Sequence, residues 1–216
     1  MSILSPALLG AVGLVLLAAA TGHVRAPASL RRGLDAHGVL PGAARPLVAG
    51  VLAPLEAVLG VVALVCAVAP VPSPVGFAVS MPIAGLFLAL TLYLARVLRD
   101  AQGRVVPCAC GLGETPVTRS AVLRPGILAV LALVGGVTSG GWSLAEAPAA
   151  EAGVALAAML VLALSVALLP AARAVPESVV THSGAHGRDG SGADERNRYE
   201  KTWQANETST FFGGDR

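Results

Sequence analysis

The sequence contains little charge and few aromatic side chains. Of its 216 residues, 13% are charged and 4% are aromatic, whereas 55% are hydrophobic. Soluble domains carry roughly a quarter of charged residues, so this composition excludes an ordinary soluble domain and points to a protein of the lipid bilayer. No repeat with a period of about 20–50 residues is visible, which excludes the common repeat architectures.

Basic residues are absent from the start of the chain. The segment "MSILSPALLG" has none, and Arg25, Arg31 and Arg32 follow the first apolar stretch instead. A secretory signal peptide has the opposite layout, with its positive charge before the apolar stretch. We therefore expect the first apolar stretch to be retained as a helix.

Five long apolar runs occur in the first 170 residues, near 3–21, 46–69, 75–97, 121–138 and 147–170. Roughly 18 or more apolar residues are enough to cross a hydrocarbon core of about 30 Å. The runs predict an all-α fold, a polytopic membrane bundle of four to five transmembrane helices over residues 1–170. Residues 171–216 are rich in Gly, Ser and mixed charges, which predicts a disordered polar tail.

The distribution of arginines predicts the orientation in a cell membrane. The segment after the first run holds Arg25, Arg31, Arg32 and Arg45, and the segment after the third holds Arg99, Arg104 and Arg119. The links "APVPSPVG" and "SGGWSLAEAP" hold none. Because basic residues stay on the cytoplasmic side, we expect a multi-pass plasma-membrane protein with its N-terminus outside and its tail in the cytoplasm.

One acidic residue, Glu56, lies inside an apolar run. It follows Pro46 by ten residues, or about 15 Å of helix, which places it near mid-membrane, where a charge is costly. We interpret it either as a group that moves protons, beside a quinone as candidate cofactor, or as a neutral acid bonded to a neighbouring helix through a hydroxyl such as that of Ser80 or Thr91. The prolines Pro54 and Pro82 indicate helix kinks, which could open a small cavity or could be ordinary packing.

The segment from Ser29 to Leu40 alternates apolar and charged residues. Leu30, Leu34 and Val39 are interspersed with arginines, Asp35 and His37. The pattern predicts a short amphipathic helix on the membrane surface, with Ser29 as a candidate N-cap. A solvated basic loop is the alternative.

Only three cysteines are present, and two of them, Cys108 and Cys110, are one residue apart in "RVVPCACGLGE". A disulfide between such neighbours requires a sharp turn, which Pro107 and Gly111 permit. It would be strained, and strained disulfides are easily reduced and are often catalytic.

The surroundings of the pair favour a reactive thiol. Arg104 and Arg119 are close in sequence, and "ETPVTRS" predicts a helix start with Thr115 as N-cap and Pro116 in the first position. Positive charge and a helix N-terminus both lower the pKa of a thiol.

Two other interpretations of the pair stay open. His23 and His37 fall on the same predicted side of the membrane, so that the two cysteines and two histidines could form a four-ligand zinc site. Alternatively, the pair is two reduced thiols in a turn. Cys66, near the opposite face, is expected to be an ordinary buried thiol.

The order of these features resembles the MauE family of methylamine-utilisation membrane proteins, which groups with DoxX-like proteins. The resemblance runs from "AAATGHVRAPASLRRGLDAHGVLP" through "PLVAGVLAPLEAVLGVVAL", where Glu56 and Gly60 match an E-x-x-x-G pattern, to "LARVLRDAQGRVVPCACGLGETPVTRSAVLRPGILAVLAL". There Cys108 and Cys110 match a C-x-C-F-G-like motif, although Gly111 stands at its aromatic position. His37 stands where the family tends to have tyrosine.

The resemblance implies a function in the maturation of methylamine dehydrogenase through disulfide formation. Catalytic roles would then fall to Cys108, Cys110 and Glu56 in a thiol-disulfide oxidoreductase, whose partners are membrane lipids and a periplasmic thioredoxin-like or client protein; nothing indicates nucleic acid. Periplasmic chemistry conflicts with the predicted cytoplasmic placement of the pair, so either the loop re-enters the membrane or the protein passes electrons on. The competing hypotheses are a carrier of small solutes or soft metals and a structural membrane partner.

Overall fold

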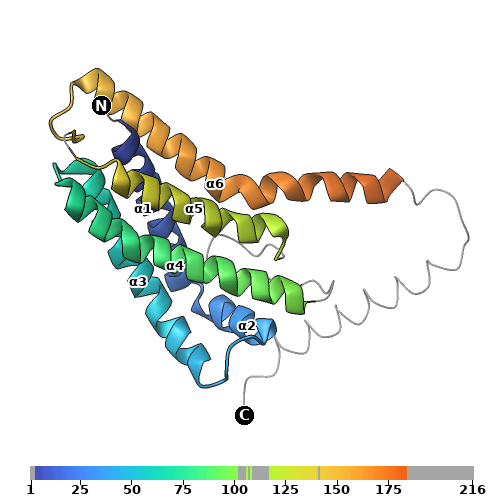
Figure 1. The fold of residues 1–216 in the computed structure, drawn as a ribbon. Helices are drawn as coiled ribbons and strands as arrows, with labels where there is room; N and C mark the ends of the chain where they lie inside the picture. Colours follow the sequence, from blue (N-terminus) through green and yellow to red (C-terminus); the bar gives the residue numbers. More distant parts are fainter. Residues whose placement is uncertain (1–2, 102–105, 107, 109–116, 141, 184–216) are drawn as a thin grey trace, which may run out of the picture. The chain divides into compact units, whose positions relative to one another are not determined.

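The computed structural model describes residues 3–101, 106, 108, 117–140 and 142–183, and within these ranges its secondary structure is entirely helical. The described helices are α1 (Leu4–Arg25), α2 (Pro27–His37), α3 (Ala44–Val68), α4 (Ser73–Asp100), α5 (Arg119–Val137) and α6 (Ala149–Ser183). Figure 1 shows α1 behind α4 and α5, with α3 and α4 diverging from their short connection. The all-α prediction is confirmed.

Five of these helices are long and apolar enough to cross a bilayer, and α2 is the exception. Their candidate membrane spans coincide with the five predicted runs to within a few residues. Large apolar side chains remain exposed along the outer faces of α3, α4 and α6, among them Val58, Val61, Leu88, Leu92, Leu160 and Leu164. Lipid is the solvent that accommodates such surfaces, and the chain is a multi-pass membrane protein.

Helix α1 forms the centre of the bundle. Most of its residues are buried, and it packs against α3 and α5, while α4 packs along α5. Met159 of α6 contacts Gly10 of α1. The main core is built around Leu9, Val12 and Leu16 of α1 with Ile83 of α4. An apolar helix buried on nearly all sides is what the continuous run of apolar residues in α1 predicts.

Two glycines allow α1 and α3 to cross closely. A Cβ atom at Gly13 would lie 2.9 Å from the carbonyl oxygen of Gly60, and one at Gly60 would lie 3.1 Å from that of Gly13. Neither position has room for a larger side chain without a shift of the backbone. Small residues at helix crossings are typical of membrane bundles, because they let the backbones approach and gain van der Waals contact.

Helix α2 has the amphipathic character that the sequence predicts. Leu30, Leu34 and His37 are buried, whereas Arg31 and Arg32 are exposed. The proposed N-cap is wrong, because the helix begins at Pro27, with Ala26 as N-cap, and Ser29 lies inside it. Proline suits the first helical position, where its missing N–H costs no hydrogen bond. Gly38 ends the helix in the left-handed conformation, with φ of 66°.

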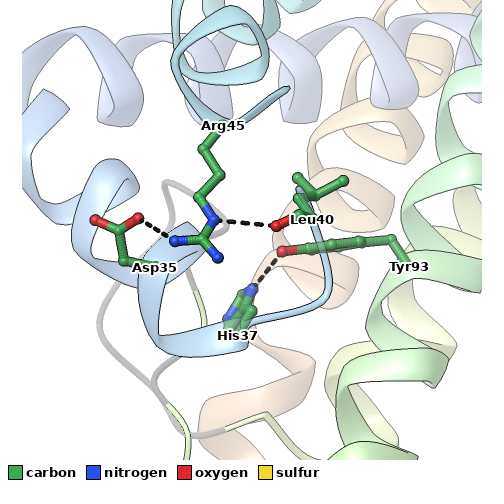
Figure 2. A network of polar contacts seen from close by, with 5 residues as sticks. All are labelled: Asp35, His37, Leu40, Arg45 and Tyr93. Atoms are coloured by element: carbon green, nitrogen blue, oxygen red, sulfur yellow. Dashed lines mark hydrogen bonds and ion pairs between the residues drawn. The ribbon is translucent and has the colours of Figure 1, made fainter. Parts of the chain in front are cut away.

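A polar network joins the end of α2 to α3 and α4. Arg45 donates from Nε to the carbonyl oxygen of Leu40 (3.1 Å) and from Nη1 to Oδ1 of Asp35 (3.0 Å). The Nδ1 atom of His37 lies 2.7 Å from the hydroxyl oxygen of Tyr93 on α4. Figure 2 shows Arg45 reaching both of its partners and His37 facing Tyr93. These bonds fix α2 across the gap between the diverging helices.

The ends of α5 and α6 differ from their predicted positions. Helix α5 begins at Arg119 with Thr118 as its N-cap, since the hydroxyl of Thr118 accepts from the amide of Ala121 at 3.4 Å. The predicted start of this helix is therefore wrong by three residues, and Thr115 and Pro116 lie outside the described residues. Helix α6 continues to Ser183, past the predicted start of the tail at residue 171. Residues 184–216 of that tail lie outside the described residues.

We expect Gly60→Leu to destabilise the bundle, because the added side chain would meet Leu17 and the backbone of Gly13. Overpacking of this kind costs about 1–3 kcal/mol. The measurement is the midpoint of thermal aggregation of the detergent-solubilised protein. The control is Gly50→Leu on the same helix, where a Cβ would meet nothing within 4 Å. Equal midpoints for the two variants would contradict the crossing.

We expect Arg45→Met to loosen α2, mainly through loss of the bond to the carbonyl of Leu40, since the Asp35 carboxylate is largely exposed. One such bond contributes about 1 kcal/mol, so amide hydrogen exchange over residues 27–37 should accelerate by about fivefold. Arg31→Met removes the same charge from an exposed position and should leave exchange unchanged. Equal acceleration in both variants would assign the effect to charge alone.

Candidate functional site

A cavity of about 310 Å³ lies where α3 and α4 diverge. It is bounded by the end of α1, by α2, and by the halves of α3, α4 and α5 that lie at this end of the bundle (Figure 1). Exposed Ala89 and half-buried Val48 and Leu52 stand on its edge, so that the cavity reaches the lipid-facing surface between α3 and α4. The apolar walls include Leu30, Leu34, Leu86, Phe87, Leu90 and Leu128.

Glu56 lies on the wall of this cavity at the centre of α3, twelve residues from Ala44 and from Val68. It is 3% exposed. Its Oε2 atom lies 3.5 Å from Nε2 of His23, at the end of α1, yet makes no hydrogen bond with any residue that the structure describes. A buried oxygen without a hydrogen-bond donor costs free energy. The carboxyl group of Glu56 can therefore exchange a proton with a ligand in the cavity or bind a polar atom of it.

The hydroxyls suggested as partners of Glu56 bond elsewhere. Ser80 donates to the carbonyl oxygen of Phe77 and Thr91 to that of Phe87, both within α4. Hydroxyls in membrane helices often bond the preceding turn of their own helix. The neighbour of Glu56 is instead a histidine brought close by the crossing of α1 and α3.

Arg124 is a second buried polar residue on the cavity wall. It lies in α5, is 6% exposed, and makes neither an ion pair nor a hydrogen bond within the described part of the chain. Ala121, Pro125 and Leu128 share its face of α5 and also line the cavity. A guanidinium can donate five hydrogen bonds, so Arg124 offers unused donors to the cavity.

The His37 and Tyr93 pair closes the cavity at the side of α2. Both residues line it, and their rings are tilted by 53° with centroids 5.5 Å apart. The hydrogen bond between them (Figure 2) fixes the phenol of Tyr93, whose ring then forms part of the wall. His37 is thus engaged with α4 rather than extended toward solvent.

Cys108 lies next to the cavity. It is buried, at 4% exposure, in a small cluster with Leu94, Val97 and Ala121, against which Tyr93 packs. Three of these neighbours, Tyr93, Leu94 and Ala121, also line the cavity, so the cysteine and the cavity share a wall. Cys108 is disulfide-bonded, Cys66 is a free thiol, and Cys110 lies outside the described residues.

A metal site receives no support from the described ranges. No group of three or more His, Cys, Asp or Glu side chains in them is close enough to hold an ion. His23 and His37, which the zinc interpretation joins, instead contact Glu56 and Tyr93 respectively. A fourth ligand of that interpretation, Cys110, is not among the described positions.

The two prolines for which the sequence predicts kinks do not line the cavity. Pro54 and Pro82 lie inside α3 and α4 but are exposed on the outer surface, and neither lines the cavity. The proline that lines it is Pro125 of α5. Because it has no N–H, the carbonyl of Ala121 lacks its usual helical donor, which adds an acceptor near the cavity.

Sequence reasoning singled out Glu56 but missed three residues that share its cavity. From the sequence, His23 is only a candidate metal ligand, and neither Tyr93 nor Arg124 is given a function. A signal for Arg124 was present, because a cation five residues inside a membrane helix is unusual and functional by default.

A family model described as "Methylamine utilisation protein MauE" matches residues 1–138. The match contains α1 to α5, and hence all the residues of the cavity and both cysteines of the pair. No curated protein and no solved structure matches the chain. Since the family model covers more than half of the sequence, this membrane protein belongs to the MauE family.

Proposed function

We propose that the chain is a membrane thiol-redox protein in which Cys108 and Cys110 cycle between a dithiol and a disulfide. The observation that carries this proposal is the disulfide at Cys108. The chain has three cysteines and Cys66 is free, so we assign Cys110 as the partner. A pair separated by one residue closes a small ring, and such a bond suits transient rather than structural use.

The environment of Cys108 supports redox exchange with a membrane site. Burial against Leu94 and Ala121 keeps the sulfur away from bulk water, and the same residues border the cavity that holds Glu56. Formation of the disulfide releases two electrons and two protons. A carboxyl group on the neighbouring cavity wall, without a hydrogen bond on Oε2, is suited to take up one of these protons.

The family description supports a maturation function for this redox activity. Members are described as methylamine utilisation proteins, and we propose that the chain supports disulfide formation in a methylamine-dehydrogenase-like or other exported client. The pair does not meet an exported client directly, because the orientation proposed below places it on the cytoplasmic side. The client loses two electrons as its disulfide forms, and the disulfide of the pair takes up two electrons as it is reduced. Electrons from each cycle leave through the membrane.

The connectivity supports one orientation. Arg25, Arg31, Arg32, Arg45, Arg99 and Arg119 all lie at the ends of helices where α2 and the cavity are found. The opposite end, with the link between α3 and α4 and the link between α5 and α6, has no basic residue in "APVPSP" or "SGGWSLAEAP". By the positive-inside tendency, we propose that the cavity end faces the cytoplasm.

Replacing Cys108 and Cys110 with serine, singly or together, should abolish client disulfide formation while leaving membrane insertion intact. Each variant lacks one sulfur of the exchanging pair. The measurement is the redox state of the client and of the protein itself, followed by gel shift with a thiol-reactive polymer. Cys66→Ser, at the far end of α3, is the matched control and should retain activity. Full activity of the double variant, or stoichiometric zinc or copper in the purified protein, would contradict the proposal.

Single cysteines at the two ends of the bundle should report its orientation. In a background with all three native cysteines changed to serine, Ala149→Cys should react with a membrane-impermeant maleimide in intact cells. Ala43→Cys should react only after permeabilisation. Both positions are exposed, so labelling depends only on whether the maleimide reaches that side of the membrane. The reverse labelling pattern would place the cavity end outside and would support direct oxidation of exported clients.

A further inference from the structure

We propose that the cavity binds the ring of a lipid-soluble quinone, which accepts the two electrons released when Cys108 and Cys110 form their disulfide. This inference rests on the proposed function, because it names the electron acceptor for the same thiol pair. Two observations support it. Glu56 and Arg124 line the cavity without a hydrogen bond on Oε2 or on the guanidinium, and Cys108 packs against residues of the cavity lining.

Two buried polar groups in the lining of the cavity, one on α3 and one on α5, call for a polar ligand. Oε2 of Glu56 lacks a hydrogen bond, and Arg124 lacks an ion pair and a hydrogen bond, within the described part of the chain. Both side chains are more than nine-tenths buried and line the cavity. Groups buried in this way are costly unless a partner satisfies them. His23 lies 3.5 Å from Oε2 of Glu56 without a hydrogen bond to it, and no described residue bonds Arg124.

The chemistry of the cavity specifies a ring with carbonyl groups. Arg124 offers donors, and a protonated Glu56 offers one more, so the ligand must present acceptors. The remaining walls are apolar and include the rings of Phe87 and Tyr93, which suit a flat ring. The opening between α3 and α4 beside Ala89 leaves room for an apolar tail to extend into lipid. A quinone combines carbonyl acceptors, a flat ring and an apolar tail.

The volume of about 310 Å³ lies at the lower end of the range of about 300–1,000 Å³ in which proteins bind small molecules. It admits one ring system and the start of a tail, and it is too small for haem or a flavin nucleotide. A fatty acid would also fit by size, and its carboxylate would suit Arg124. It would bring a second carboxyl group toward Glu56, however, and it cannot accept electrons.

The reaction balances with a quinone as oxidant. The two thiols lose two electrons and two protons as the S–S bond forms, and the quinone gains both to become a hydroquinone. Cys108 packs in a cluster with Tyr93, Leu94 and Ala121, which also line the cavity, so these side chains lie between the sulfur and a ring bound in the cavity. Glu56 holds and returns a proton at Oε2, and His23 at 3.5 Å from that atom is the group through which the proton passes.

The first test measures binding apart from thiol chemistry. The full-length chain with Cys108→Ser and Cys110→Ser is purified in detergent, and a tritiated decyl-tailed benzoquinone is bound in a scintillation proximity assay. We expect saturable binding. Arg124→Leu should weaken it by about tenfold or more, as loss of a charged hydrogen-bond donor does. Leu52→Trp, which fills the cavity edge, should weaken it similarly without a change of charge.

Matched controls separate the site from general damage. Arg119→Leu removes an exposed cation from the same helix as Arg124, and Leu47→Trp places the same large side chain on an exposed position of α3 outside the cavity. Both should bind as the parent does. Equal losses in test and control variants, absence of saturable binding, or equally strong displacement by decanoate would each overturn the inference, the last in favour of a lipid site.

The second test measures electron transfer by the wild-type cysteines. The reduced protein is mixed with the quinone, and hydroquinone formation is followed by absorbance in a single turnover. Glu56→Gln should bind within a few-fold of wild type but form hydroquinone at least about tenfold more slowly, because an amide cannot carry the proton. Glu151→Gln, at the exposed start of α6, should match wild type. Binding without hydroquinone formation would overturn the inference.

The outcomes distinguish this inference from the proposed function. If the cysteine variants abolish client oxidation in cells while the purified protein binds no quinone, the thiol cycle stands and another acceptor serves it. If the cysteine variants stay active in cells, the proposed function fails even where the quinone is bound.

Discussion

The close approach of α1 and α3 at Gly13 and Gly60 determines where the polar residues of this membrane protein meet. With the backbones in contact there, one turn of α3 toward its start brings Glu56 to the last turns of α1 and to His23. The E-x-x-x-G spacing therefore has a simple physical meaning. Gly60 lets the two backbones approach, and Glu56, one turn earlier on the same face of α3, therefore lies within 3.5 Å of His23. Helices α3 and α4 diverge from their short connection. Helix α2 lies at the far end, held by Arg45 and by the bond between His37 and Tyr93.

Burial of charged residue types in the bilayer is costly, about 2.5–3.5 kcal/mol each at a helix centre on insertion scales. This bundle places Glu56 and Arg124 in the lining of one cavity without joining them in an ion pair. A purely structural function would be served as well by apolar residues at both positions. The arrangement is explained if these two groups bind a ligand or transfer a proton. Cys108 belongs to a cluster that shares residues of α4 and α5 with the lining of the same cavity. The thiol pair and the cavity are then two parts of one site.

The membrane spans and α2 could be predicted from the sequence, because bilayer thickness fixes the length of an apolar run and amphipathic spacing marks a surface helix. The importance of Glu56 could be predicted as well, since a carboxyl in an apolar run needs a reason. Its neighbour His23 could not, because the two residues are brought together by a crossing angle that no local pattern encodes. The start of α5 was also beyond reach, because Thr115 and Thr118 are both acceptable N-caps by residue type, and the structure has Thr118 in that position. The cavity depends on the divergence of α3 and α4, which is a property of the whole bundle.

Because the cavity opens toward lipid near Ala89, its occupancy depends on the concentration of the ligand in the membrane. A molecule dissolved in the acyl chains reaches such an entrance by lateral diffusion in two dimensions and never passes through water. Occupancy then follows the mole fraction of that molecule among the lipids, so even a weak intrinsic preference fills the site when the membrane pool is large. Bilayer composition, rather than any aqueous concentration, would set how fast the protein works.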